Sequence, residues 1–345
     1  RGASYAGEGV GDSRDPATGL PVYSLFGATP KPTAEMLKGV DVVVYDLQDL
    51  GTRSYTFATT LALVMEAAAD AGVPVVVLDR PDPLGGLRVE GNVPPPRWHR
   101  SFVCWLRVPY VYGLTPGELA RMIDGEGWLP GGKKAKLTVV PMKGWRRSML
   151  FQDTGLPWVP TSPHIPHAET TPFYPMTGLA GPFLNNGVGY TAPFEYLAAP
   201  WVDADRFAEK MNALKLPGLY FRSTAYKPFY AAYKGRVCRG VQVHILDPRR
   251  APLFPVSFYA LDVLNRMYPE KRLLADAPRR PQVWWERLLG IPAEPRYDWG
   301  DWEDAVGDPS IRKELAGGRS MKSFLGYWKR GREDFLRRRR KYLLY

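Results

Sequence analysis

Two short apolar runs at residues 42–44 and 75–78, about thirty residues apart, constrain the fold of this chain more than any other feature. The runs contain only Val and Leu, which is typical of strands that are buried on both faces of a parallel sheet. The stretch between them places apolar side chains at helical spacing until Gly72, and Thr52 or Ser54 can cap this helix at its start. We therefore predict a right-handed strand-helix-strand unit with two parallel strands.

Polar and charged residues follow the carboxyl ends of both predicted strands. They are Asp46, Gln48, Asp49, Arg53 and Tyr55 after the first strand, and Asp79 and Arg80 after the second. Ligands of open parallel sheets bind at this edge. Hydrolysis of a glycoside needs one carboxylic acid to protonate the leaving oxygen and a second carboxylate as base or nucleophile, and arginine can hold a substrate carboxylate. The alternative is structural: Asp46 with Arg80, or Asp79 with Arg53, forms a buried ion pair that shapes the loop.

Two long loops carry further candidates. Glu90 lies in a loop rich in turn residues that follows the second strand, where it is either a catalytic or sugar-binding acid or an exposed turn residue. His164 lies among the six prolines of residues 155–177, where it contacts substrate or packs within the loop. His164 and His167 are three residues apart, but the prolines between and around them preclude one helical face, and Glu169 is the one Cys or acid at metal-ligand spacing. We therefore expect no metal and no cofactor. The absence of a GxGxxG or Walker pattern gives no support to nucleotide binding.

The length of 345 residues allows two domains, which we place at 1–150 and 151–345. For the second domain we predict an α+β fold with helices at 204–214 and 255–268 and a strand at 239–246. The apolar content of 45% is ordinary, and no apolar run is long enough to span a membrane. No signal segment opens the sequence.

The net charge of +11 is concentrated near the end of the chain. Residues 316–345 contain ten Lys or Arg and two acids, a balance of +8. We interpret this region first as a solvated helix face, next as a surface that attracts an anionic polymer such as a cell wall, and last as a nucleic-acid site. We therefore expect no nucleic-acid partner.

Seven phrases of the sequence together resemble the NamZ-like (YbbC-like) exo-β-N-acetylmuramidases, a family of glycoside hydrolases formerly called a domain of unknown function. The phrases are LPVYSLFG at 20–27, VYDLQDLGTRSYT at 44–56, VLDRPDPLG at 77–85, VEG at 89–91, GLPWV at 155–159, SPHIP at 162–166 and PFE at 193–195. The resemblance covers almost the whole chain. It implies a Rossmann-like first domain, a smaller α+β second domain and a site in the cleft between them.

The sequence departs from the family pattern in two places. Family members usually carry a further strand and a Pro-Glu-His-Gly loop just before the point that matches Arg1, and its glutamate is a plausible catalytic acid. Three alternatives stay open: a fragment, a trimmed product, or a member that relies on Asp46, Asp49 or Glu90. Many family members carry two phrases that contain acids and an arginine, and this chain has AGPF at 180–183 and NNGVGY at 185–190 in their place. Asn185 and Tyr190 can hydrogen-bond sugar hydroxyls but cannot replace a carboxylate in acid-base catalysis. These departures place the chain in a divergent branch of the family.

The expected function is a bacterial, cofactor-independent hydrolase that releases terminal N-acetylmuramic acid, or a related amino sugar, from peptidoglycan fragments. Asp46, Asp49 and Glu90 are the catalytic candidates, Arg53 and Arg80 bind the substrate carboxylate, and the other residues of the sugar site are Gln48, Tyr55, Asp79, His164, Asn185 and Tyr190. The alternative is a catalytically impaired protein that binds cell-wall carbohydrate. The expected partner is a peptidoglycan-derived sugar or muropeptide. We expect a secreted or periplasmic location, with the cytoplasm as the alternative, and make no prediction of oligomeric state.

Overall fold

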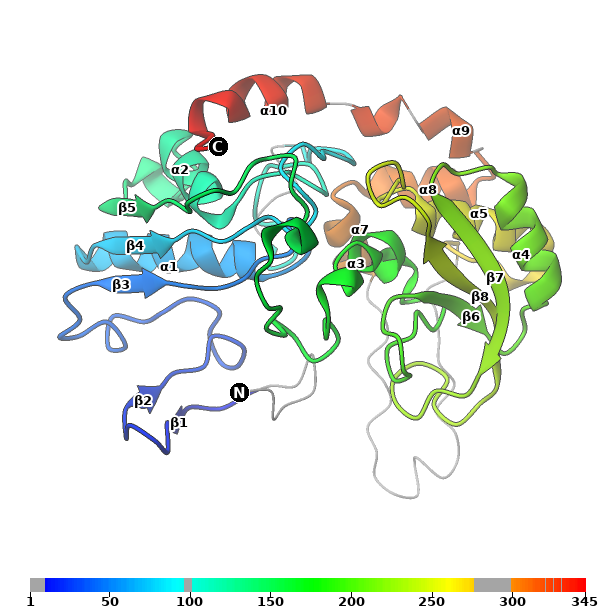
Figure 1. Ribbon diagram of the computed structural model, residues 1–345, viewed down its shortest axis with the longest axis horizontal. Helices are drawn as coiled ribbons and strands as arrows, with labels where there is room; N and C mark the ends of the chain where they lie inside the picture. Colours follow the sequence, from blue (N-terminus) through cyan, green and yellow to red (C-terminus); the bar gives the residue numbers. More distant parts are fainter. Residues whose placement is uncertain (1–9, 96–100, 276–298, 320, 325, 330) are drawn as a thin grey trace. The chain divides into compact units, whose positions relative to one another are not determined.

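The computed structural model describes residues 10–95, 101–275 and 299–345, except for residues 320, 325 and 330 (Figure 1). These residues form two compact units. Unit 1 contains residues 10–89, 101–168 and 331–345, and unit 2 contains residues 90–95 and 169–329 apart from the gaps. The final segment of the chain therefore belongs by its contacts to the unit that the beginning of the chain builds.

A three-stranded parallel sheet forms the centre of unit 1. Its strands β3 (Val43–Tyr45), β4 (Val75–Leu78) and β5 (Leu137–Val140) lie in the order β3-β4-β5. Helix α1 (Phe57–Ala71) connects β3 to β4, and α2 (Pro116–Gly125) precedes β5 (Figure 1). A short antiparallel ribbon of β1 (Ser13–Arg14) and β2 (Pro21–Val22) comes before the sheet. The predicted parallel strand-helix-strand unit is confirmed.

The two faces of this sheet differ in burial. Tyr45, Val75 and Val77 are buried on the face that α1 packs against, and the Tyr45 hydroxyl donates a hydrogen bond to the carbonyl of Phe57 at the start of α1 (2.9 Å). Val44 points to the other face and is 54% exposed. The prediction that the first apolar run is buried on both faces is therefore wrong, because alternate side chains of β3 point away from α1.

The ends of α1 test the predicted helix signals, and the start of α2 shows a further one. Helix α1 ends at Gly72 as predicted, since this glycine adopts the left-handed conformation (φ 70°). The predicted caps Thr52 and Ser54 are wrong, because the residue before the helix is Thr56, which makes no side-chain capping bond. Helix α2 begins with a capping box, in which the Thr115 hydroxyl accepts from the Glu118 amide (3.2 Å) and the Glu118 carboxylate accepts from the Thr115 amide (3.1 Å).

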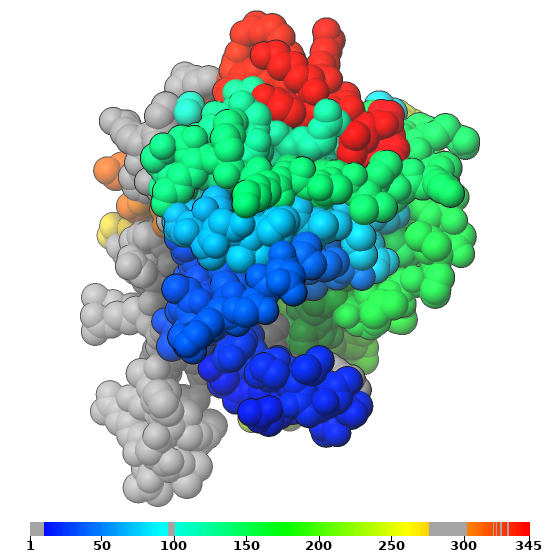
Figure 2. Space-filling view, turned by 90° about the vertical axis from the view of Figure 1, so that its left-hand side faces the viewer, coloured from blue at the N-terminus to red at the C-terminus, as the bar shows by residue number. Residues whose placement is uncertain are grey.

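The C-terminal segment, residues 331–345, contains α10 (Arg332–Arg339) and packs on α2. In the space-filling view its red atoms lie directly above those of α2 and the residues that follow (Figure 2). Arg338 donates to Glu126 at the end of α2 (2.8 Å from Nε), and Arg339 is buried with Nη1 on the Gly113 carbonyl (3.0 Å). The prediction of a solvated basic face is therefore wrong for these two arginines, since both side chains bind acceptors of unit 1.

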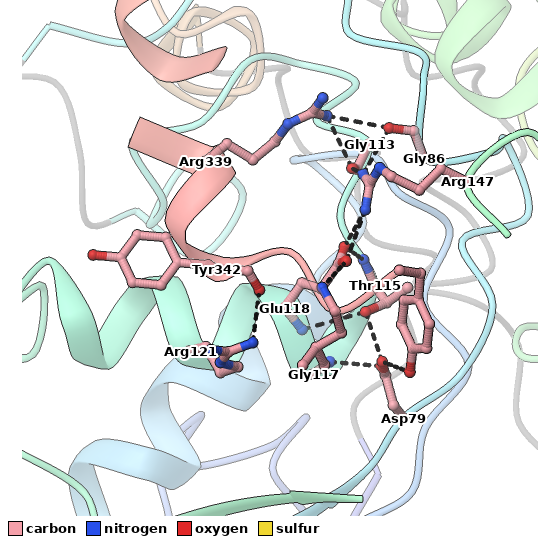
Figure 3. Close-up of polar contacts among 12 residues, drawn as sticks. Asp79, Gly86, Gly113, Thr115, Gly117, Glu118, Arg121, Arg147, Arg339 and Tyr342 are labelled. Carbon is pink, nitrogen blue, oxygen red and sulfur yellow. Dashed lines mark hydrogen bonds and ion pairs between the residues drawn. The ribbon is translucent and has the colours of Figure 1, made fainter. Parts of the chain in front are cut away.

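Glu118 joins the C-terminal segment to the start of α2 (Figure 3). Its carboxylate is fully buried and accepts two hydrogen bonds from Nη1 of Arg147, at 2.7 and 2.9 Å. The same carboxylate also accepts from the Leu344 amide (2.9 Å). A buried carboxylate is stable only while its hydrogen-bond donors stay in place. The packing of the C-terminal segment and the conformation at the start of α2 therefore depend on each other.

Unit 2 is built on an antiparallel sheet. The strands β6 (Tyr196–Ala199), β7 (Leu219–Tyr226) and β8 (Cys238–Ile245) lie in the order β6-β8-β7, and α4 (Ala204–Ala213) packs on β7 and β8 (Figure 1). The other α-helices that the structure describes in this unit are α3 (Phe173–Thr177), α5 (Val256–Met267), α7 (Trp299–Val306), α8 (Pro309–Ala316) and α9 (Met321–Phe324). The predicted helices at 204–214 and 255–268 and the strand at 239–246 are confirmed to within two residues. Among the described residues, no helix is both long and apolar enough to cross a bilayer.

Candidate active site

The carboxyl ends of β3 and β4 lie side by side because the two strands are parallel neighbours. Asp46 leaves the first strand and Arg80 follows the second, and they form an ion pair with 2.6 Å between Nη2 of Arg80 and Oδ1 of Asp46. Nε of Arg80 donates to the same oxygen (2.7 Å). Both side chains are more than 40% exposed, so this pair contributes little to stability and can exchange partners.

Asp49 lies in the same loop but is buried, with 4% of its surface exposed. Its Oδ2 accepts hydrogen bonds from the Gly51 amide (2.9 Å) and from the Tyr112 hydroxyl. Its Oδ1 accepts none from the described residues. Burial raises the pKa of Asp49 to about 6, although these hydrogen bonds oppose the shift. A carboxyl with such a pKa can hold or release a proton near neutral pH.

Asp82 is a second buried carboxyl that our sequence analysis did not select. It is 1% exposed, its Oδ1 accepts from the Leu84 amide (3.0 Å), and its Oδ2 has no hydrogen-bond partner in the described chain. Burial raises the pKa of Asp82 to about 8, and the negative charge of Asp49 adds to the shift. Its position three residues after Asp79, in the loop at the same sheet edge, was the signal that could have identified it.

Gly51 contacts both of these carboxyls. Its amide donates to Asp49, and a Cβ added to it would lie 2.4 Å from Oδ1 of Asp82. The residue also adopts φ +68°, which disfavours any side chain. Glycine at this position therefore allows the loops after β3 and β4 to pack with two acids beside each other.

Gln48 and Tyr55 form hydrogen bonds between loops of unit 1, and His164 lies in one of these loops. The Gln48 side-chain amide donates to the carbonyls of Asp49 (2.8 Å) and Pro81 (2.9 Å) and so joins the loops after β3 and β4. Tyr55 is buried, and its hydroxyl lies 2.6 Å from that of Thr161. His164, in the same loop as Thr161, is half-buried, and burial lowers the pKa of its imidazole. The histidine is therefore neutral at neutral pH.

Arg53 and Asp79 are engaged inside unit 1. Arg53 is fully buried, donates from Nη1 to the Val108 carbonyl (2.8 Å) and has its guanidinium 5.6 Å from the centre of the Tyr110 ring. Burial lowers its pKa. Asp79 is not paired with Arg53 as the structural alternative supposed.

Asp79 instead anchors the start of α2 (Figure 3). Its carboxylate accepts hydrogen bonds from the Gly117 amide, the Thr115 hydroxyl and the Tyr345 hydroxyl, each at 2.7 Å. Burial raises the pKa of Asp79, while these hydrogen bonds oppose the shift. All of these contacts lie within unit 1, so the carboxylate has a structural function whether or not it also contacts substrate.

Three predicted site residues belong to unit 2. Glu90 accepts hydrogen bonds from the amides of Leu253 (2.8 Å) and Phe254 (3.0 Å), just before α5. Asn185 is buried, and its side chain donates to the carbonyls of Val188 and Ala232 and accepts from the Gly187 amide and the Tyr226 hydroxyl.

The third, Tyr190, is half-buried and stacks on Tyr226, with 4.7 Å between ring centres. The side chain of Asn185 is thus committed to holding its own loop, while Tyr190 keeps part of its ring accessible.

Comparison with known proteins shows which family this chain resembles. The model of the N-terminal domain of exo-β-N-acetylmuramidase NamZ matches residues 1–169, and the model of its C-terminal domain matches residues 172–345. The peptidoglycan β-N-acetylmuramidase NamZ of Bacillus subtilis is 38% identical over 346 residues, which cover 100% of this chain and 77% of the relative.

Two solved structures from Bacteroides fragilis, both described as DUF1343 family proteins, have the same fold. One is 42% identical with a TM-score of 0.86, and the other is 26% identical with a TM-score of 0.69. In both cases the match covers 96% of this chain and 82% of the solved chain. The predicted α/β fold class and the predicted family are both confirmed: this chain belongs to the NamZ family of exo-β-N-acetylmuramidases.

Proposed function

We propose that this chain is a glycoside hydrolase that releases terminal N-acetylmuramic acid from peptidoglycan fragments. The observation that carries the proposal is the match of this chain to 77% of a relative named as a peptidoglycan β-N-acetylmuramidase, together with both family models. Two carboxyl groups are enough for glycoside hydrolysis without a cofactor, and the sheet edge carries several carboxyl groups.

Asp49 is our candidate for the general acid. Hydrogen bonds from Gly51 and Tyr112 fix one carboxyl oxygen, and the other accepts none from the described residues. Because its pKa is about 6, a substantial fraction of the side chain is protonated in mildly acidic solution. Asp46, half-exposed at the end of the same strand, is the candidate for the second carboxylate, and Glu90 of unit 2 is the third catalytic candidate. Different environments for two acids are the usual means of assigning them different roles.

Arg80 is our candidate for binding the lactyl carboxylate of N-acetylmuramic acid. Its guanidinium is 44% exposed and already binds a carboxylate, that of Asp46, through Nε and Nη2. A substrate carboxylate can take the same two donors, which releases Asp46 for chemistry. Arg53 is the weaker candidate because its guanidinium is engaged by the Val108 carbonyl and lies near the Tyr110 ring. Gln48, Tyr55 and His164, all in unit 1, are further candidates for contacts to the sugar.

A wall-binding protein without activity is not favoured. That alternative rested on the acids missing from residues 180–190 and assigned wall binding to the basic C-terminal helix. In that helix, Arg338 and Arg339 contact Glu126 and backbone carbonyls of unit 1. The Bacillus relative is also named for catalysis. Because peptidoglycan lies outside the cytoplasmic membrane, we propose that the enzyme acts in the periplasm or outside the cell.

The test is hydrolysis of para-nitrophenyl β-N-acetylmuramide, with the matching glucosaminide as the control substrate. We expect phenolate release from the muramide alone. Release from both substrates at equal rates, or from neither, would contradict the proposed specificity.

Variants test the assignment of the acids. Asp49→Asn should lower kcat by about 100-fold or more while the protein stays folded, as judged by circular dichroism. Asp41→Asn is the matched control, since Asp41 is an exposed acid just before the same strand. Full activity in Asp49→Asn would rule out Asp49 as the acid, and the same comparison with Asp46→Asn and Glu90→Gln would then identify the carboxyl that matters.

A further inference from the structure

The hairpin of β7 and β8, residues 219–245, has an unusual charge composition. It contains five cations and no carboxylate, and six aromatic residues are distributed among them. The cations are Arg222, Lys227, Lys234, Arg236 and Arg239, and all five side chains are exposed. Within the described chain none of them forms an ion pair with an acid, so their positive charge is available to a partner.

Helix α4 covers one face of this hairpin. Phe221, Val241 and Val243 point to that face and are buried, and the side-chain amide of Asn212 on α4 bonds the backbone of Phe221 (2.8 and 3.0 Å). On the opposite face Arg222 donates to the side chain of Gln242 (2.7 Å). The same face also carries Tyr226 and Cys238, which are buried in a cluster with Tyr196. The hairpin is therefore a rigid support that is packed on both faces, with Arg222 exposed beside the cluster.

The connecting loop at residues 227–237 presents aromatic surface beside the cations. Phe229 is 68% exposed, and the guanidinium of Arg236 lies 5.7 Å from the centre of the Tyr233 ring. A ring this exposed can stack on the apolar face of a ligand, while the neighbouring cations can bind its negative charges.

Backbone hydrogen bonds fix the conformation of this loop. The Gly235 amide donates to the Pro228 carbonyl (2.7 Å), and the Phe229 amide donates to the Gly189 carbonyl (2.9 Å). Ala231 and Tyr233 adopt positive φ values of 58° and 60°, which are unfavourable for residues with a side chain. Such strain persists only where the surroundings hold it, and it is common at ligand-binding positions. The loop is thus ordered before a partner binds.

We propose that this hairpin of unit 2 binds the anionic glycan of peptidoglycan, an inference that rests on the proposed function. An N-acetylmuramic acid without a stem peptide carries a free lactyl carboxylate, and the stem peptides carry carboxylates of their own. The unpaired lysines and arginines can bind either group. The apolar faces of sugar rings can stack on Phe229 in the manner of other aromatic contacts. Charge and aromatic surface together therefore match an acidic sugar chain.

The test compares two pairs of charge reversals in the full chain. Lys227→Glu with Lys234→Glu changes the hairpin, and Arg206→Glu with Lys210→Glu makes the same change in net charge on the exposed side of α4. Binding is measured by co-sedimentation with purified peptidoglycan sacculi and with uncharged chitin, at low and high salt. We expect the hairpin variant to bind sacculi about tenfold more weakly, the α4 variant to bind within about twofold of the unmodified chain, and chitin to bind weakly throughout. Equal losses in both variants, or no loss in the hairpin variant, would overturn the proposal.

A second variant and a second substrate separate this surface from the active site. Phe229→Ser should weaken sacculus binding by about fivefold, while kcat and KM on the small para-nitrophenyl muramide stay within about twofold. Equal loss on the small substrate would place Phe229 at the active site instead. If the unmodified chain hydrolyses no muramide, the proposed function fails, but sacculus binding still tests the hairpin. Tighter binding to duplex DNA than to sacculi would also contradict the glycan as its partner.

Discussion

Replacing Asp82 by Asn should change how the stability of the fold depends on pH. The carboxyl is 1% exposed, and burial raises its pKa to about 8, compared with about 4 in an unfolded chain. Between these two values the folded protein keeps the proton that the unfolded chain releases. Stability is therefore lost as pH rises from about 4 through about 8, with a slope of about 1.4 kcal/mol per pH unit. Between pH 5 and 7 this single group should cost roughly 3 kcal/mol.

Asparagine has nearly the same shape as the protonated acid and does not ionise. The free energy of unfolding of Asp82→Asn, measured in urea at pH 5, 6 and 7, should therefore increase relative to the unmodified chain by roughly 3 kcal/mol across this range. Asp46→Asn is the matched control, because the Asp46 carboxylate is 42% exposed and its replacement should leave the slope nearly unchanged. Parallel pH profiles for Asp82→Asn and the unmodified chain would refute the reasoning, since they would mean that the buried group is already ionised at pH 5.

Three further substitutions test other contacts by urea unfolding. Glu118→Gln should destabilise unit 1 by about 3 kcal/mol, because it leaves the Arg147 guanidinium without its buried carboxylate, and a loss below about 1 kcal/mol would contradict this role. Gly51→Ala should cost about 3 kcal/mol through its positive φ and its approach to Asp82, whereas a neutral effect would show that the loops can move apart. Glu90→Gln should cost about 1 kcal/mol by weakening two bonds to backbone amides before α5, and a much larger effect would require contacts beyond these.

Local chemistry explains why several elements could be predicted from the sequence. The strand-helix-strand unit follows from continuous Val-rich runs at crossover spacing, and Gly72 and the Thr115 capping box act within a single turn of chain. Family membership was also visible in the sequence, because it rests on phrases of contiguous residues. The same local rules brought Asp46, Asp49, Asp79 and Arg80 to one edge of a parallel sheet.

What each of these side chains does there depends on residues far away in the sequence. Asp79 is engaged by Tyr345, which lies 266 positions further along the chain. Asp49 is buried against Tyr112, 63 positions away, and its pKa and that of Asp82 follow from this burial. Val44 is exposed because α1 packs on the other face of the sheet. The sequence by itself determined the elements, the family and the group of candidate acids, because these depend on neighbouring residues. Only the tertiary structure decided which acids are anchored, buried or exposed, because desolvation and hydrogen bonding depend on whatever the folded chain places around each group.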